Sequence, residues 1–273
     1  MSVAVQEVVQ DKTGALLAKL KEGVTDLISS QKWKEYLQVQ ARFHKYSAGN
    51  VMLIMAQRPD ASRVAGYNHW KELGRYVKKG ERGIAIFAPV TYKIKAEDDD
   101  AEFTRLVGFK VVYTFDISQT DGKELPDHPS TLLDTIGTES LMQTMLAVAN
   151  KLDITVRIGD AHGANGYYNH ATNGIIVSDS VPLAQKTKTL IHELAHSCLH
   201  ATWVPDISRS QREVEAESAA YIVSQYYGLD SADYSFGYVA TWSKADPESV
   251  VRYGERIRKA ATKIIDLAEH IQK

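Results

Sequence analysis

The chain has 273 residues, and 44% of them are hydrophobic, so it can fill one large core or two ordinary ones. This composition excludes a fibrous protein and a disordered tail. The 32 Lys and Arg residues nearly balance the 34 Asp and Glu residues, and the formal net charge is -2. Any affinity for nucleic acid must therefore come from a local basic patch rather than from the overall charge.

The sequence gives no sign of export or of membrane insertion. Its single cysteine, Cys198, cannot form an internal disulfide, and the N-terminal sequence lacks the basic start and apolar run of a signal peptide. The longest apolar stretches, such as VMLIMA at 51–56, are much shorter than the roughly 18 to 20 residues that cross a bilayer. We expect a cytoplasmic protein that does not contact a membrane.

The first half of the chain predicts helices followed by a long hairpin. Apolar residues recur at three- and four-residue spacings over 12–57, and Pro59 ends this pattern, which indicates two or three helices. Strands are predicted for 83–94 and 106–118. The acidic residues between them, which are typical of a solvated hairpin loop, are Glu97, Asp98, Asp99, Asp100 and Glu102.

The segment 120–129 holds two prolines and has no apolar period, so we place a domain boundary there. The predicted domains are 1–125 and 126–273. In the second domain the patterns predict helices over 132–152, 182–200 and 210–227, a strand at 154–158 and a hairpin at 166–178. Because no alternating βαβ pattern or Gly-rich phosphate loop is present, the predicted fold class is α+β in both domains.

A final helix is predicted to begin at Asp246-Pro247-Glu248, where an N-cap residue is followed by proline at the first helical position. Its apolar residues fall on one side, which indicates a packing face. They are Val250, Ile257, Ala261, Ile264, Ala268 and Ile271.

The most specific motif is HELAH, residues 192–196, which has the HExxH pattern of metallopeptidases. On a helix, four residues advance by about 6 Å and little more than one turn, so His192 and His196 can bind one ion. Glu193 lies beside the first histidine, where a carboxylate can act as the catalytic base. Two imidazoles with a carboxylate and water suit Zn²⁺, although Mn²⁺ or Fe²⁺ is an alternative.

A catalytic zinc site needs a third protein ligand, and the acidic helix downstream offers candidates. Glu213 and Glu217 are four residues apart and share a face. We take Glu213 as the ligand and Glu217 as the carboxylate that orients a ligand histidine. The reverse assignment is the main alternative, and Asp206 is a weaker one.

Other residues near the motif have less definite roles. The strand 175–178 before the helix could bind an extended peptide by its edge. His200 lies too far along the helix from His192 to share the ion, so we expect it to pack or to support a ligand, and we expect Cys198 to be a small buried side chain. The phenols that could stabilise an oxyanion are those of Tyr167, Tyr168, Tyr221, Tyr226 and Tyr234.

The segment 63–82 is basic and aromatic, with six basic residues against two acidic ones and a formal charge of +4. Such a mixture can pair phosphates and stack unpaired bases, which favours single-stranded over duplex DNA. The alternative is that Tyr67, Trp70 and Leu73 are core residues at helical spacing. The predicted DNA-contacting residues are Arg63, Tyr67, Trp70, Lys71, Arg75, Lys78, Lys79 and Arg82.

Both regions resemble a known family. The stretch YSAGNVMLIMAQRPDASRVAGYNHWKELGRYVKKGERGIAIFAPV, followed by FDISQT, resembles the N-terminal single-stranded-DNA-binding domain of the ArdC antirestriction family. The HELAH helix and the segment REVEAESAAY resemble that family's zincin-like metallopeptidase domain, which is also similar to the ImmA/IrrE metallopeptidases. The resemblance covers about residues 16 to 238.

The resemblance implies a protein of mobile genetic elements that coats incoming single strands and so protects them from restriction enzymes. It also implies that His192 and His196 are ligands and that Glu193 is catalytic. The ImmA/IrrE segment E-x-x-A-N falls on 213–217 and begins at the ligand Glu213, but Glu217 stands in place of its asparagine.

We therefore expect a single-stranded-DNA-binding antirestriction-type protein with a zinc-dependent, gluzincin-like metallopeptidase domain that acts on a protein or peptide substrate. One alternative is a non-enzymatic DNA-binding protein in which zinc only joins two helices. Another is a regulatory protease that cleaves a repressor. Peptide substrate, oligomeric state and the role of the last helix cannot be predicted from the sequence.

Overall fold

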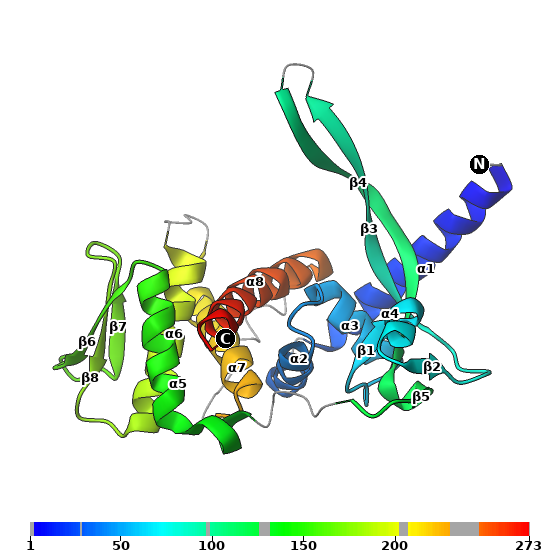
Figure 1. The fold of residues 1–273 in the computed structure, drawn as a ribbon. Coiled ribbons are helices and arrows are strands. Elements are labelled where there is room, and N and C mark those ends of the chain that lie inside the picture. Colours follow the sequence, from blue (N-terminus) through cyan, green and yellow to red (C-terminus); the bar gives the residue numbers. More distant parts are fainter. Residues whose placement is uncertain are drawn as a thin grey trace. The chain divides into compact units, whose positions relative to one another are not determined.

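The structure is a computed structural model that describes residues 3–27, 29–96, 99–125, 132–201, 207–229 and 246–272. The chain forms two compact units (Figure 1). The first unit comprises Met1–Val24 and Met52–Leu125, and the second comprises Thr25–Val51 and Pro126–Lys273. The segment 25–51 thus packs with the second unit although it lies early in the sequence.

The predicted α+β class is confirmed, because helices and sheets alternate irregularly along the chain. The helical N-terminal region forms three helices, as the apolar spacing predicts. They are α1 (Val3–Asp26), α2 (Ser30–Arg42) and α3 (Ala48–Gln57). Of the three points at which the chain passes between the units, two fall within helices, α1 and α3, and the third is at 125/126.

The sheets of the first unit are built around one hairpin, β3 (Ile84–Ala96) with β4 (Asp99–Asp116), which is longer than predicted. It projects from the rest of its unit (Figure 1). Of the acidic residues expected in the hairpin loop, Glu97 and Asp98 lie outside the described residues, whereas Asp99, Asp100 and Glu102 belong to β4. The short elements around the hairpin are β1 (Val64–Gly66), α4 (Tyr67–Glu72), β2 (Arg75–Val77), a 3₁₀ turn (Ile117–Gln119) and β5 (Thr120–Gly122).

Asp116 holds these short elements to the end of the hairpin. Its Oδ2 accepts hydrogen bonds from the backbone N–H groups of Ser62 (2.8 Å) and Arg63 (3.0 Å), and its Oδ1 accepts from Ser118. Burial opposes ionisation of Asp116, but these hydrogen bonds outweigh it and lower the pKa of the carboxyl. The segment 62–66 is therefore fixed beside β4, where β1 pairs with it.

The second unit is a helical core with a three-stranded sheet. Helix α5 (Leu132–Lys151) packs on α6 (Leu183–His200), which packs on α7 (Arg209–Tyr226), and α8 (Pro247–Ile271) contacts all three. Helix α2 also packs on α7, and the buried Trp33 indole N–H donates to Ser218 Oγ at 2.9 Å. None of the helices in the described residues combines the length and the apolar character needed to cross a membrane.

The predicted beginning of the last helix is confirmed. Asp246 is the N-cap, and its side chain accepts from the backbone N–H of Ser249 at 2.9 Å. The predicted apolar face is buried from Val250 to Ala268, whereas Ile271 at its end is only half-buried. A well-capped helix with one apolar face is therefore held firmly against the core.

The sheet of the second unit has the order β6-β8-β7, and this order corrects one prediction. Strand β8 (Gly174–Ser178) pairs in parallel with β6 (Thr155–Gly159) and antiparallel with β7 (Gly166–Asn169). Because β8 is paired on both sides, the expectation that its edge could receive a peptide is wrong. Strand β7 is an outer strand of the described sheet.

Candidate metal centre

Three predicted side chains converge between α6 and α7. His192 Nε2 and His196 Nε2 lie 3.0 Å apart, and Glu213 Oε2 lies 3.6 Å from the first and 3.4 Å from the second. Within the described residues they form a group in which one ligand atom from each lies within 4.8 Å of the others. Two imidazole nitrogens and one carboxylate oxygen that face one point fit a divalent cation.

The geometry follows from packing of the two helices. Leu190, Ile191, Leu194 and Ala195 are fully buried and fix α6, whereas Leu183 at its beginning is 40% exposed. On α7 four small residues are buried, which lets the neighbouring helices approach closely. These residues are Ala216, Ser218, Ala219 and Ala220.

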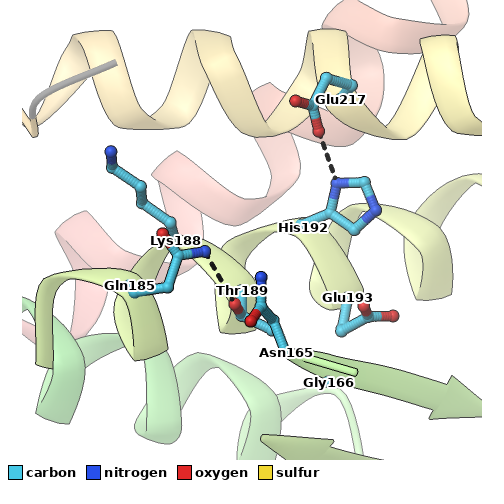
Figure 2. Close-up of a pocket in the computed structure, with 8 residues that line it drawn as sticks. All are labelled: Asn165, Gly166, Gln185, Lys188, Thr189, His192, Glu193 and Glu217. Carbon is cyan, nitrogen blue, oxygen red and sulfur yellow. Dashed lines mark hydrogen bonds and ion pairs between the residues drawn. The ribbon is translucent and has the colours of Figure 1, made fainter. Parts of the chain in front are cut away.

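Glu217 contacts the opposite nitrogen of His192. Its Oε2 lies 3.0 Å from His192 Nδ1, so this carboxylate can fix the proton on Nδ1 and leave Nε2 free for an ion (Figure 2). Glu213 instead faces the Nε2 atoms of both histidines. The arrangement favours Glu213 over Glu217 as third ligand, and both assignments stay predictions.

The carboxylates around His192 determine its charge in the absence of a cation. Burial lowers the pKa of His192, but hydrogen bonds with Glu213 and Glu217 outweigh it and raise the pKa to about 10. The same histidines hold the pKa of Glu213 far below its usual range. Without a metal ion, His192 is therefore protonated, and its positive charge pairs with the surrounding carboxylates. A metal ion that binds this histidine would displace a proton.

Glu193 follows His192 on α6, lines the same cavity as that histidine (Figure 2) and is almost completely buried. Burial raises the pKa of its carboxyl, although His192, His196 and a hydrogen bond from the backbone N–H of Tyr168 lower it, and the net shift is upward. A carboxylate with a raised pKa is suited to accept and return a proton near neutral pH. The Tyr168 N–H lies on β7, so the outer strand of the sheet also fixes the position of Glu193.

A cavity of about 310 Å³ opens onto Glu193 and His192 (Figure 2). It lies between α6, α7 and the beginning of β7. A site next to a cavity of this size can receive part of a substrate. The lining residues are Asn165, Gly166, Gln185, Lys188, Thr189, His192, Glu193 and Glu217.

Gly166 allows β7 to lie against α6 near the site. A Cβ at this position would be 2.5 Å from Thr189 Cγ2 and 2.7 Å from the carbonyl oxygen of Ile176. We therefore expect Gly166→Ala to lower the free energy of unfolding by about 1–3 kcal/mol, because the strand must shift away from the helix. Thermal unfolding measures this change.

The matched control is Gly159→Ala in β6 of the same sheet, where a Cβ would meet no atom within 4 Å. This control should leave the unfolding temperature nearly unchanged. Equal stabilities of the two variants would contradict the close packing of β7 on α6.

The tyrosines expected near the site do not line the cavity, as far as the described residues extend. Tyr221 is fully buried in the core, Tyr226 donates to Glu269 Oε1, and Tyr168 donates to Asn173 Oδ1. Tyr167 lies on β7 and is half-buried. Tyr234 and the alternative ligand Asp206 lie outside the described residues.

His200 and Cys198, one turn or less beyond the motif, have different surroundings. His200 is buried, and its Nδ1 lies 3.2 Å from His196 Nδ1. Burial lowers the pKa of His200, so the ring favours its neutral form. Cys198 is half-buried rather than fully buried, and burial raises the pKa of its thiol.

The predicted DNA-contacting residues all belong to the first unit, and the structure corrects one of them. Trp70 is fully buried, and its indole N–H donates to the carbonyl oxygen of Phe115 at 2.9 Å. A ring in the core cannot stack on a base, so Trp70 is a packing residue, in agreement with the alternative interpretation of the segment. Tyr67, three residues earlier on α4, is 56% exposed.

The cations of this segment fall into two groups. The Arg75 guanidinium is bound to β5, where it donates to Thr120 Oγ1 and to the carbonyl oxygens of Thr120 and Lys123. Lys78 donates to the Ser118 carbonyl oxygen. The side chains of Lys71, Lys79 and Arg82 are exposed, and that of Arg63 is half-buried.

Sequence reasoning missed exposed apolar side chains on the β3–β4 hairpin. Tyr92, Leu106, Val107, Phe109 and Tyr113 are each more than half exposed. The sequence could not predict this exposure, because apolar residues in a strand are equally typical of a buried face. Tyr76 on β2 is also exposed (61%).

Comparison with protein families divides the chain in two. Residues 6–127 match the N-terminal domain of the anti-restriction factor ArdC, and residues 149–228 match the IrrE N-terminal-like domain. The chain is therefore similar to ArdC in its first part and to the IrrE N-terminal-like domain in its second. The resemblance predicted from the sequence is thus confirmed over most of the chain.

Two crystal structures of the antirestriction protein ArdC from plasmid R388 are similar in fold to this chain. The metal-free form is 22% identical, with a TM-score of 0.52 over 84% of this chain and 87% of that one. The Mn(II)-bound form is also 22% identical, with a TM-score of 0.54 over 91% of this chain and 97% of the other. At this identity the likeness shows the fold alone.

A curated relative is an uncharacterized protein of Bacillus anthracis, 25% identical over an alignment of 307 positions, gaps included. The alignment covers 96% of this chain but only 52% of that protein. The chain therefore spans about half the length of this relative.

Proposed function

We propose that the protein binds single-stranded DNA through its first unit and carries a metal-dependent peptidase site in its second unit. The observation that supports the peptidase site best is the convergence of His192 Nε2, His196 Nε2 and Glu213 Oε2 beside the buried carboxylate of Glu193. Two ligand histidines four residues apart, with a glutamate after the first, are typical of zinc peptidases.

Glu193 would act as the general base and acid of peptide hydrolysis. A bound divalent ion would lower the pKa of water and polarise a carbonyl group. Glu193, held by the Tyr168 N–H, would accept the proton of the attacking water and return it to the leaving amine. The outer strand β7, which pairs in the described sheet only with β8, would offer its other edge to an extended peptide.

The proposed ion is Zn²⁺, because two imidazoles and one carboxylate suit it. The Mn(II) form of the R388 protein makes Mn²⁺ the rival. Metal analysis of the purified chain should find about one equivalent of a transition metal. Loaded protein should cleave unfolded, fluorescently labelled casein, and a chelator should stop the cleavage. A metal-bearing chain that cuts no protein would instead favour an ion that only joins α6 and α7.

The DNA-binding half of the proposal concerns the loop after β2 and the exposed residues of α4. Lys71, Lys79 and Arg82 can contact phosphates, and Tyr67 can stack on a base. The match to the N-terminal domain of ArdC over residues 6–127 supports this role. Coating of incoming single strands would then protect them from restriction enzymes, which is the antirestriction role we propose.

The double variant Lys79→Glu/Arg82→Glu should bind a short single-stranded oligonucleotide at least about tenfold more weakly, because two attractive interactions with phosphates become repulsive. The plot of log affinity against log salt concentration should become less steep, by about 0.7 for each phosphate that the variant no longer neutralises. Fluorescence anisotropy at several salt concentrations measures both quantities.

The control is Arg157→Glu on β6, an exposed arginine of the second unit. Its oligonucleotide affinity should equal that of the wild type. If the wild type binds no oligonucleotide even at low salt, the DNA-binding half fails, and the basic segment would more simply dock a protein substrate of a regulatory protease.

A further inference from the structure

The second nitrogen of His196 begins a buried chain of polar groups that crosses three helices. His196 Nδ1 lies 3.2 Å from His200 Nδ1, and His200 Nε2 lies 3.2 Å from Glu215 Oε2. The same carboxylate oxygen lies 3.1 Å from a guanidinium nitrogen of Arg256. The two histidines belong to α6, Glu215 to α7 and Arg256 to α8.

Only one pattern of protons satisfies this chain when His196 Nε2 binds a cation. That nitrogen must be unprotonated, so the proton of His196 is on Nδ1 and is donated to His200 Nδ1. His200 then carries its proton on Nε2 and donates it to Glu215. Arg256 donates to the same carboxylate and supplies the positive charge that balances it.

Because the middle of this chain of contacts is buried, each of its polar groups needs its hydrogen-bond or ion-pair partner. Glu215 is completely buried and the His200 side chain is 4% exposed, whereas the Arg256 side chain is 30% exposed. A buried carboxylate is strongly unfavourable unless it is paired and hydrogen-bonded. Arg256 provides the ion pair, and Gln211 Nε2 donates to Glu215 Oε1 at 3.4 Å.

The two predicted ligand histidines are therefore supported differently. His192 contacts a single carboxylate, Glu217, through its Nδ1, and the side chain of Glu217 is 29% exposed. His196 is connected through buried groups to the last helix of the chain. We propose that His200, Glu215 and Arg256 are positioning residues that hold the His196 ring in the tautomer and orientation needed to bind the ion.

This inference rests on the proposed metal centre and assigns a role to α8. Support of a ligand by a polar partner typically contributes about 10- to 100-fold to metal affinity. The probe is Co²⁺, whose absorption spectrum reports the geometry of its ligands. His200→Leu removes both contacts of the ring, whereas His200→Asn keeps an acceptor oxygen near the position of Nδ1.

We expect His200→Leu to bind Co²⁺ about 10- to 100-fold more weakly and with an altered absorption spectrum, and His200→Asn to recover a large part of both. Arg256→Gln should weaken binding in the same direction, while Arg252→Gln, the same change one turn earlier on α8, should not. Melting temperatures of the metal-free chains show which variants are folded. In the Zn²⁺-loaded wild type, nitrogen NMR should find protons on His196 Nδ1 and His200 Nε2.

Two results would overturn the inference in distinguishable ways. If the wild type binds Co²⁺ and the folded His200→Leu and Arg256→Gln variants match its affinity and spectrum, the chain of contacts only stabilises the fold and the metal centre survives. If the wild type binds neither Co²⁺ nor Zn²⁺, the proposed metal centre fails and this inference fails with it.

Discussion

The Glu213→Ala variant is expected to lose tight binding of a divalent cation, whereas Glu217→Ala should bind it about 10- to 100-fold more weakly than the wild type. The reason is that Glu213 Oε2 faces the Nε2 atoms of both histidines, at 3.6 and 3.4 Å. Glu217 faces only the far nitrogen of His192, at 3.0 Å. One change removes a ligand, and the other removes the support of a ligand.

These two variants control for each other. The residues lie four apart on α7, both changes remove one negative charge, and alanine is the best helix former. Competition between the protein and a chelator for Zn²⁺ measures both affinities. A greater decrease of affinity in Glu217→Ala than in Glu213→Ala would reverse the assignment, and wild-type affinity in both would remove α7 from the site.

The local part of this site could be predicted from the sequence because it depends on one helix. The spacing of His192 and His196 brings their rings together on any regular helix, and their centroids are 4.7 Å apart. The contacts that lead from His200 through Glu215 to Arg256 could not be predicted in the same way. Glu215 and Arg256 are 41 positions apart in the chain, and only the packing of α7 on α8 brings them together.

The long elements were predicted well because the residues that start or end a helix agree with the spacing of the apolar residues. Pro59 follows α3, and Asp246-Pro247 begins α8. The elements β1, α4, β2 and β5 were missed because each has only three to six residues. Their structure depends on contacts distant in sequence, such as those of Arg75 with β5 and of Asp116 with residues 62 and 63.

Two errors have the same physical cause. The pattern of apolar and polar residues predicts a helix or strand, but it does not determine which other elements pack against it. The residues of β8 have the pattern of a strand, but its position between β6 and β7 depends on the sheet order. Trp70 lies in a basic segment, yet its ring is buried and its indole N–H donates a hydrogen bond to the carbonyl oxygen of Phe115. Composition indicates a charged surface there, whereas only tertiary packing decides which aromatic rings face outward.

The Glu193→Gln variant is expected to keep its fold and its metal but to cleave casein about 100- to 10,000-fold more slowly than the wild type. The amide has nearly the same shape, and its oxygen can still accept the Tyr168 N–H, but it cannot accept a proton from water. Fluorescence release from labelled casein at a fixed metal content measures the rate. Oligonucleotide affinity should be unchanged, because Glu193 belongs to the second unit.

Glu139→Gln on α5 is the matched control, since it makes the same change at an exposed position of the same unit. It should cleave casein at the wild-type rate. If the Glu193→Gln protein retains its metal and cleaves equally fast, another group must move the proton, and Glu193 would be a structural carboxylate. If only cleavage is abolished while DNA remains protected in a restriction assay, hydrolysis and DNA protection are separable activities that depend on different units of the chain.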